Sequence, residues 1–387
     1  LDAEKIEKEV QGMLRTCGRL ANSTLVQETA PGTAQIVSDV QDNCQAFQKR
    51  IPLIAVLSNK GMRTRHWEEI DEIVSFQIRP NPKKTLDDYR NIAKYMEELQ
   101  RVSDQATKEF GVEKMLGEMN EAWLPLTYTF NTSFRETGAA IFKGESVDMV
   151  YEILEEQLVK IQTLSSLPQA EYFSDEVERQ QKFLDDTQRI ADLVLEVQAA
   201  WIYLYPVFGS EDIKRALEME SNAFAGVDAE WRRITTRAQV HPQVVRVSAI
   251  ENIIERLEAM SKSVEKIQLG LKRYLDEKRQ GFPRFFFLSD EELLEILAET
   301  RNPRKIQPFL RKIFEGIRTV KFQEGRGGDE NALEIIAMVS GKSEQIWLSS
   351  PVDPMQYGSG ACEKWLVDLE NRMRDTICAE LRVAIEQ

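Results

Sequence analysis

The chain has 387 residues and a formal net charge of −14, with 42% hydrophobic and 29% charged residues. These fractions are typical of a folded globular protein, and the negative charge disfavours general affinity for nucleic acid because phosphates would be repelled. No run of about 18 apolar residues stands out, so we expect no membrane span. The chain begins with Leu1 rather than an initiator methionine, and we expect it to be a piece of a longer protein.

Helical patterns dominate the first part of the chain. Arg65, His66 and Trp67 start a segment of helical spacing, in which we expect Trp67 to anchor an early helical bundle. A capping-box pattern at Thr85 and Asp88 predicts a helix that runs to about Phe110 and ends before Gly111. An interruption follows, where residues 124–131 and 139–142 are typical of a β-hairpin.

Longer helices are predicted in the middle of the chain. Apolar residues step at helical spacing from Val147 to Ile161, and Ser174 can cap a helix that ends near Pro206. A further stripe with an alternating spacing of three and four predicts one helix over about residues 248–279. A stand-alone coiled coil is an alternative, but the other stripes offer partners within the chain and favour an intramolecular bundle.

The last third mixes helices with a second hairpin. Ser289 and Glu292 form another capping box, and a final helix carries apolar residues from Cys362 to Ile377. Residues 335–339 and 345–348 flank a short polar turn and predict a hairpin, and a mobile loop is expected at residues 325–329. We therefore predict a mostly α fold, an elongated rod of consecutive helical bundles with one or two small β-hairpins.

Candidate chemistry is scarce. The four cysteines are widely spaced without a C-x-x-C pattern, which favours reduced thiols in a cytosolic compartment. The two histidines, His66 and His241, are too few for a zinc site or a catalytic dyad. Gly341-Lys342-Ser343 resembles the end of a phosphate-binding loop, but Ile336 stands where that motif needs a glycine. We expect no catalytic residue, no metal site and no nucleotide site, so the fragment should neither bind nor hydrolyse ATP.

Several unusual strings of residues are more specific than the helical periodicity. They occur in one order along the chain: Pro52-Leu53-Ile54, residues 65–70, residues 201–208 with 210–213, Val227-Asp228 with Trp231, residues 274–279, residues 282–289, residues 293–297, Asn302-Pro303, Gln307-Pro308, and Trp365-Leu366 with Glu370. In this order and spacing they resemble the linker region of dynein heavy chains, from about Phe47 to Met373. The string Phe282-Pro283-Arg284-Phe285 with the residues that follow it is the most specific, and residues 205–213 and 286–292 look more like axonemal than cytoplasmic heavy chains.

The resemblance implies a mechanical function. The family's linker is an arched rod that lies across a ring of AAA+ modules, and its bending and straightening, driven by ATP, produce the power stroke on microtubules. It implies two halves of the rod, 1–205 and 206–387, with the second leading toward the first AAA+ module. ATP and magnesium would belong to the ring of the full-length chain, and no cofactor to this fragment. Ser340 to Glu344 replaces the family's more usual acidic turn, so family contacts are not expected there.

Partners and location are also implied by the resemblance. The AAA+ ring of the same heavy chain would be the direct partner, microtubules an indirect one, and dynein intermediate and light chains would attach through a tail. Neither nucleic acid nor a membrane is expected. The location would be the cytoskeleton on the cytoplasmic side, in the axoneme of a cilium or flagellum. A passive helical scaffold or tethering module without a motor role is the alternative, and an enzyme with a hidden site is a second rival.

Candidate interface residues follow from the strings and from the charge. They are Arg65, His66, Trp67, Trp201, Phe282, Pro283, Arg284, Phe285, Arg304 and Lys305. Residues 145–196 hold 13 acidic and 4 basic residues, a net of −9, whereas residues 262–321 hold 14 basic and 9 acidic residues, a net of +5. Solvated helix faces would explain both runs, and docking of the basic part on an acidic partner surface is the sharper hypothesis. Pro168, residues 206–210 and residues 281–283 are candidate hinges.

Overall fold

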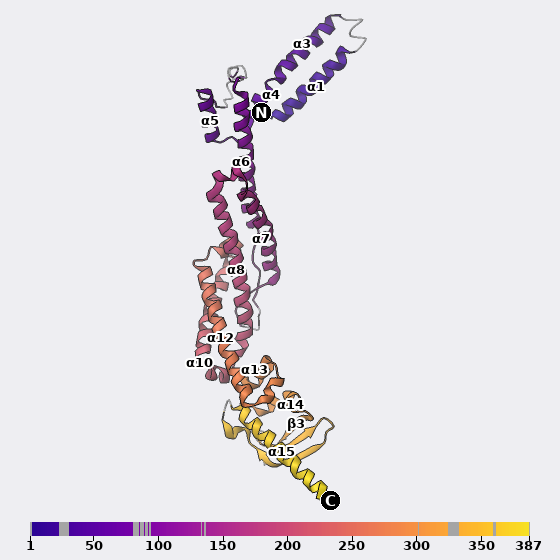
Figure 1. Cartoon of the computed structure of the whole chain (residues 1–387), viewed down its shortest axis with the longest axis vertical. Helices are drawn as coiled ribbons and strands as arrows, with labels where there is room; N and C mark the ends of the chain where they lie inside the picture. The colour runs from indigo at the N-terminus through magenta and orange to yellow at the C-terminus, as the bar shows by residue number, and fades with distance from the viewer. Residues whose placement is uncertain are drawn as a thin grey trace. The chain divides into compact units, whose positions relative to one another are not determined.

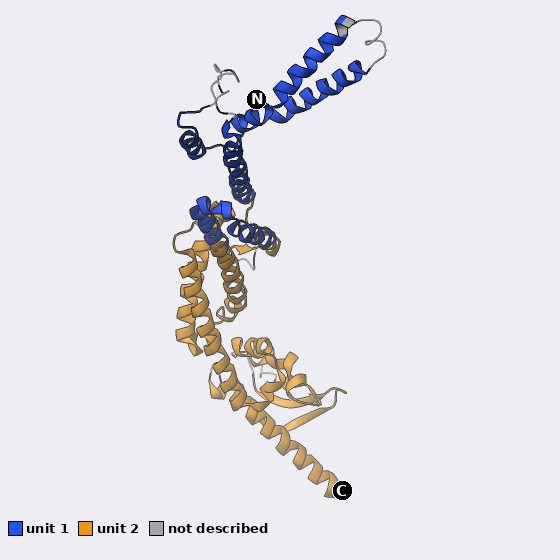
Figure 2. Cartoon of the chain, turned by 45° about the horizontal axis from the view of Figure 1, so that its top comes forward, with its two compact units in different colours: residues 1–125, 152–184 blue, residues 126–151, 185–387 orange. Residues whose placement is uncertain are grey.

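The computed structural model describes residues 2–22, 31–79, 85, 89, 92, 94–132, 134, 137–300, 302–323, 333–358 and 361–386. Most of them are helical, and two small antiparallel sheets complete the structure (Figure 1). The predicted mostly α fold with small hairpins is confirmed, and the rod shape stays a prediction. Figure 2 shows two compact units, unit 1 (residues 1–125 and 152–184) and unit 2 (residues 126–151 and 185–387). The predicted halves at 205/206 stay a prediction.

Unit 1 is built from helices. Its elements are α1 (Ala3–Ala21), α3 (Pro31–Gln48), α4 (Ile51–Ser58), α5 (Thr64–Val74), α6 (Met96–Trp123), the 3-10 turn η3 (Pro168–Phe173) and parts of α7 (Gly144–Ser165) and α8 (Ser174–Val207). Helix α1 packs on α3, and α4 and α5 both pack on α6. Val56, Ile70 and Val102, each 1% exposed, belong to the core between these three helices. Trp67 is partly buried and packs against that core, so its anchoring role stays a prediction.

Helix α6 differs from its predicted span. It begins at Met96, not at Thr85, and it continues through Gly111 to Trp123. Asp88 of the predicted capping box lies outside the described residues. A glycine inside a helix costs only about 1 kcal/mol, and the buried side chains of Leu116 and Trp123 beyond it outweigh that cost.

Unit 2 begins with a short hairpin and an aromatic core. Strands β1 (Phe130–Asn131) and β2 (Ile141–Phe142) pair antiparallel, over fewer residues than predicted. The second half of α8 is followed by α9 (Glu211–Ala216), α10 (Glu218–Val240), α11 (Val244–Ser248) and α12 (Ile253–Gly281). Trp201 and Trp231 are fully buried and stacked with ring centroids 6.5 Å apart. The indole N–H of Trp201 donates to Asp228, so this core also positions a charged group.

The long predicted helix is interrupted near its start. It begins at Ile253 instead of Ser248 because Asn252 adopts the left-handed conformation, with φ of 51°. The predicted stripe from Ile253 to Leu271 is buried, and α12 packs on α10 in the same unit, as an intramolecular bundle requires. Leu275 rather than Tyr274 ends the buried stripe, because a straight helix drifts from a strict seven-residue repeat.

The end of unit 2 combines short helices with a three-stranded sheet. Its elements are η4 (Pro283–Phe287), α13 (Asp290–Ala298), η5 (Pro303–Ile306), α14 (Gln307–Ile313), β3 (Ile317–Phe322), β4 (Ile335–Ser340), β5 (Gln345–Val352), η6 (Pro354–Tyr357) and α15 (Cys362–Glu386). The strand order is β3-β4-β5, with α15 packed against β5. The predicted β4–β5 hairpin is confirmed, and β3 is an additional strand. The loop predicted at residues 325–329 lies outside the described residues.

One segment has the composition of a membrane span. Residues Pro168–Val207 contain an 18-residue window with mean hydropathy 1.3, which meets the length and polarity of a span, contrary to the expectation from the sequence. More than half of that window, 56%, is buried inside the protein. Leu204 and Trp201 are both 0% exposed, so this part of α8 packs as a core helix.

Candidate functional site

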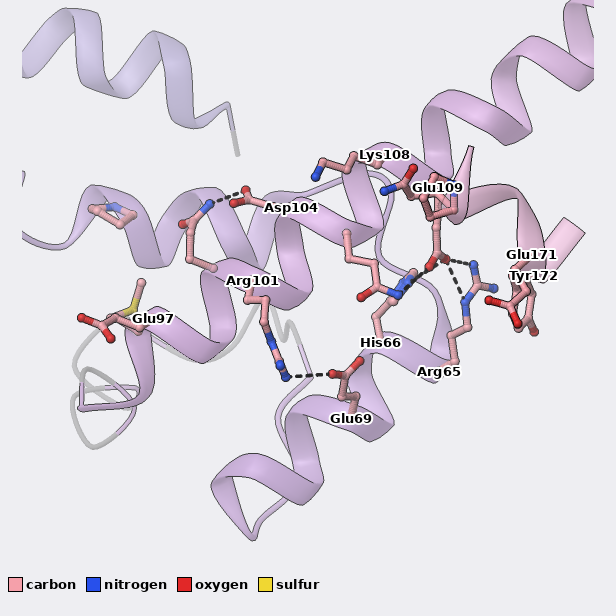
Figure 3. A pocket seen from close by; sticks show the side chains of 16 residues that line it. Arg65, His66, Glu69, Glu97, Arg101, Asp104, Lys108, Glu109, Glu171 and Tyr172 are labelled. Atoms are coloured by element: carbon pink, nitrogen blue, oxygen red, sulfur yellow. Dashed lines mark hydrogen bonds and ion pairs between the residues drawn. The ribbon is translucent and has the colours of Figure 1, made fainter. Parts of the chain in front are cut away.

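A hollow of unit 1 lies among α4, α5, α6 and η3 and has a volume of about 1230 Å³ (Figure 3). Charged side chains dominate its lining: Arg65, Glu69, Glu97, Arg101, Asp104, Lys108, Glu109 and Glu171. Two of the predicted residues, Arg65 and His66, belong to this lining. The contacts that these two residues make in the hollow therefore indicate their roles.

A buried carboxylate organises the hollow. The side chain of Glu109, on α6, is only 6% exposed. The Nε and Nη2 groups of Arg65 both donate to its Oε2, and Gln105 donates to Oε1 at 2.9 Å. His66 Nε2 lies 3.0 Å from the same Oε2 (Figure 3). Three residues thus converge on one carboxylate and tie the first turn of α5 to the middle of α6.

The hydrogen bonds of His66 fix the position of its proton. Nδ1 accepts from the backbone N–H of Arg63, at 3.1 Å, just before the first turn of α5. The ring proton must then sit on Nε2, which donates to Glu109. Both nitrogens of this buried ring are engaged, so His66 caps a helix and holds a carboxylate.

The charge of Glu109 is stabilised by its partners. Burial by itself would raise the pKa of this carboxyl. The hydrogen bonds from Arg65 and Gln105 and the positive charge of Arg65 act the other way, and the pKa lies below its usual value. Glu109 therefore stays ionised at neutral pH as one half of a largely buried ion pair.

Arg65 also reaches the turn between α7 and α8. Its guanidinium carbon lies 3.5 Å from the ring centroid of Tyr172, on η3. Such a cation–π contact contributes about 0.5–1 kcal/mol at an exposed site. Tyr172 is 64% exposed, and it also contacts Phe173 edge to face, with ring centroids 5.7 Å apart. One side chain thus links three elements of the unit: α5, α6 and η3.

Sequence reasoning found Arg65 and His66 but missed Glu109 and Tyr172. Glu109 is 44 residues from Arg65 along the chain, and no spacing rule connects the two. A signal did exist, because Glu109 falls on the same helix face as Val102 and Ala106, which are buried. A carboxylate on a buried face needs a cationic partner. Trp67 does not join the cluster, since it packs against the core of the unit, with Arg79 6.0 Å from its ring.

The predicted aromatic string in unit 2 divides between core and surface. Phe282 and Phe285 are fully buried and contact edge to face, with centroids 5.1 Å apart, whereas Phe286 and Phe287 are about two-thirds exposed. Pro283 opens the turn η4, which contains Phe285 and both exposed rings. Arg284 stacks 5.2 Å from the ring of Phe314 and forms an ion pair with Glu370 at 3.2 Å. The first pair therefore has a packing role, and the second presents apolar surface.

The positive charge of residues 262–321, the basic run, is partly neutralised by acidic side chains of unit 2. Lys278, Arg279, Lys305 and Lys312 form ion pairs with Glu363, Asp290, Glu299 and Glu292, respectively. Arg304 lies 4.7 Å from the ring centroid of Phe322. Both residues chosen as interface candidates, Arg304 and Lys305, are thus held by neighbours on their own unit.

The phosphate-loop-like tripeptide lies in the turn between β4 and β5. The N–H groups of Lys342 and Glu344 both donate to Ser340 Oγ, and that of Ser343 donates to Ser340 O. A phosphate cradle needs free backbone N–H groups, and these three are engaged in the turn. The hairpin prediction is confirmed, and the absence of nucleotide binding stays a prediction. The described residues hold no His, Cys, Asp and Glu group that suits a metal ion.

Comparison with known proteins gives one consistent result. Residues 1–384 match the family model described as Dynein heavy chain, N-terminal region 2. Dynein axonemal heavy chain 1 of Mus musculus is 32% identical over 388 residues, which cover 100% of this chain and 9% of that protein. Dynein axonemal heavy chain 3 of Homo sapiens gives the same values, and human Dynein axonemal heavy chain 12 is 37% identical over 82% of this chain and 10% of its own length. The chain spans about a tenth of the length of these relatives.

Proposed function

Because the chain belongs to the dynein heavy chain family and corresponds to its N-terminal region 2, we propose that it is the mechanical linker of such a heavy chain. In this role it bends and straightens across an AAA+ ring and so converts ATP hydrolysis in the ring into a stroke on microtubules. The predicted family is confirmed, and the relatives named above are axonemal, as the strings at residues 205–213 and 286–292 indicated.

The packing of α12 on α10 carries this proposal. Helix α12 has 29 residues, a length of about 44 Å at 1.5 Å per residue. Its stripe of buried side chains, including Leu257 and Leu271, runs along nearly that whole length. Close-packed interiors are nearly incompressible, so such a pair of helices transmits force with little loss. A lever arm needs this property, whereas a passive tether does not.

A lever also needs places where it yields. The three candidate hinges all fall at ends of elements: Pro168 opens η3, residues 206–210 span the junction of α8 with α9, and residues 281–283 span the junction of α12 with η4. Hinges consist of a few residues at such ends, where a change of backbone angles disturbs little packing. We propose that the lever bends at one of these three places.

The chemistry would lie outside these residues. We assign ATP and magnesium to the ring of the full-length heavy chain and none to this segment. The AAA+ ring of the same chain would be its direct partner, and microtubules would be reached through the complete motor. Intermediate and light chains would bind the tail, and the motor would work in the axoneme of a cilium or flagellum.

Softening α12 in the complete heavy chain tests the lever role. Leu257→Ala with Leu271→Ala removes buried side chains, each at a cost of about 2–5 kcal/mol. We expect slower microtubule gliding at an unchanged ATPase rate, because ring chemistry continues while the stroke is transmitted poorly. Lys266→Ala, at an exposed position of the same helix, is the control. Gliding at the control speed, with faster hydrogen exchange in α12 as proof of softening, would contradict the proposal.

A further inference from the structure

Unit 2 contains an apolar hollow between α8 and α13, which we call the α8–α13 groove. Its volume is about 460 Å³. Helix α8 contributes Ala199, Ile202, Tyr203, Pro206 and Val207, helix α13 contributes Glu291, Leu294, Glu295 and Ala298, and α9 adds Ile213. The four α13 residues, and all the α8 residues except Val207, lie at positions i, i+3, i+4 and i+7, which form one helix face. Two helical faces therefore line the two sides of one groove.

The walls of the groove are fixed by hydrogen bonds. Ser210 Oγ donates to the carbonyl oxygen of Ala298 at 2.9 Å, and Thr300 Oγ1 donates to Asp212 at 2.6 Å. These bonds tie the end of α13 to the start of α9. At the other end of α13, Ser289 caps the helix. The groove is thus preformed, as binding sites usually are.

The lining combines apolar walls with an acidic rim. Leu294 is 5% exposed, and the small side chain of Ala298 leaves room for another backbone to approach. Glu291 and Glu295 are exposed one helical turn apart, and neither has an ion-pair partner among the described residues. Burial, followed by the charges of Asp290 and Glu291, raises the pKa of Tyr203, so this ring lies within the acidic field.

We propose that the α8–α13 groove binds an amphipathic helix from a part of the same heavy chain outside these 387 residues. A helix that lies between two others presents anchors at i, i+3, i+4 and i+7, which matches both walls. Its bulky apolar side chains would fill the groove against Ile202 and Leu294. Lysine or arginine one turn away would pair with Glu291 and Glu295. The proposal rests on the proposed linker function, and it names the surface through which the linker engages the rest of its chain.

The size of the groove favours a partner in the same polypeptide. Stable complexes between separate proteins bury about 1,200–2,000 Å² of surface, far more than a groove that holds a few side chains. A partner in the same polypeptide acts at an effective concentration set by the chain that joins the two, up to millimolar for a short connection, so a small contact can be enough. The chain spans about a tenth of its relatives, so most of such a heavy chain lies outside it. A weak contact also releases readily, as a moving part requires.

Photocrosslinking in the full-length heavy chain tests the proposal. Benzoylphenylalanine at Ile202 should crosslink to a peptide of the same heavy chain, outside this segment, that carries apolar residues beside lysine or arginine. The same probe at Met219, which is 83% exposed elsewhere in unit 2, is the positional control and should not give that product. Crosslinks from Ile202 only to separate proteins, or to no protein, would overturn the proposal.

Two variants make the test specific. Glu291→Lys with Glu295→Lys should lower the crosslink yield about tenfold, because two attractive pairs become repulsive. Glu255→Lys with Glu265→Lys, two exposed acids on α12, carries the same charge change and should leave the yield unchanged. Ala199→Phe fills the groove from an exposed position and should abolish the product independently of charge. An unchanged yield in both groove variants would refute the proposal. Crosslinking needs no gliding, so a failed lever test and a failed groove test are distinguishable.

Discussion

At Glu109 the effects of burial and of charge on the pKa oppose each other. Its pKa is lowered although its side chain is almost fully covered, since Arg65 and Gln105 bind the ionised form. A group with a lowered pKa in the folded state adds stability above its unfolded pKa, near 4.3 for Glu, and that stability is lost as the pH falls through the folded pKa. Unit 1 should therefore depend on this carboxylate at neutral pH and not at strongly acidic pH.

The first prediction concerns Glu109→Gln. We expect it to lower the free energy of unfolding at pH 7 by about 1–3 kcal/mol, because a charged hydrogen-bond partner of Arg65 is lost. The difference from wild type should shrink as the pH falls below the ordinary pKa of a Glu carboxyl, near 4.3, and should disappear once the wild-type carboxylate is protonated. Urea unfolding at several pH values measures it, with Glu113→Gln at a more exposed ion pair as the control. A pH-independent difference would show that shape, rather than charge, matters at this position.

The second prediction compares two cysteines on one helix. Cys362 is 3% exposed near the start of α15, and burial raises the pKa of its thiol, whereas Cys378 is exposed further along the helix. The thiolate is the reactive form, so Cys378 should react with a maleimide within minutes and Cys362 only after unfolding. Mass spectrometry of the labelled peptides gives the order. Rapid labelling of Cys362 in the native chain would mean that α15 detaches from the unit.

At the scale of whole elements, hydrophobic stripes predicted the long helices and misplaced some of their ends. The stripe over α12 was found because its spacing is regular over many turns, but the left-handed Asn252 that separates α11 from α12 has no signature in the stripe. Gly111 was taken as an end of a helix, yet α6 continues past it. The helix continues because the residues after Gly111 bury one face of α6, and that burial depends on tertiary contacts that the local sequence does not contain.

The third prediction uses two glycines with opposite roles. A Cβ at Gly61 would lie 2.4 Å from the backbone oxygen of Ala106, so Gly61→Ala should force α6 away and cost about 1–3 kcal/mol. A Cβ at Gly111, exposed inside α6, meets no atom within 4 Å, and Gly111→Ala should stabilise the unit by about 0.5–1 kcal/mol. Denaturant unfolding of both variants measures the signs. Equal signs would contradict the close approach of the residue 59–63 loop to α6.

For the molecule as a whole, motifs in the sequence predicted the family, the fold class and part of the candidate site. Residues 281–283 were predicted as a candidate hinge, whereas the division of the four phenylalanines of this string into a buried and an exposed pair emerged only from the structure. The pairing of Arg65 with Glu109 depends on how α5 packs on α6, and no local pattern encodes it. The charge count for residues 262–321 similarly ignored ion pairs such as Lys278 with Glu363, which reduce the charge available to a partner.

The fourth prediction concerns the basic residues that remain available for docking. Lys272 and Arg273 are exposed on α12 and have no ion-pair partner in the described part of the chain, whereas Lys305 is paired with Glu299. If the basic run docks on an acidic face of the ring, Lys272→Glu with Arg273→Glu should change gliding speed in the complete motor more than Arg304→Glu with Lys305→Glu does. Each exposed pair contributes only about 0–1 kcal/mol, so the contact can form and release in every cycle.

The salt dependence of the gliding speed distinguishes a loss of docking from a folding defect in this test. Exposed charges are screened over about 10 Å at 0.1 M ionic strength, so the effect of Lys272→Glu with Arg273→Glu should fade as salt is added. A folding defect would persist, and an unchanged melting temperature excludes it directly. If gliding speed and its salt dependence match wild type in both double variants, the basic run is a solvated helix face. The groove between α8 and α13 would then remain as the docking surface of this unit, since its apolar contacts do not depend on the basic run.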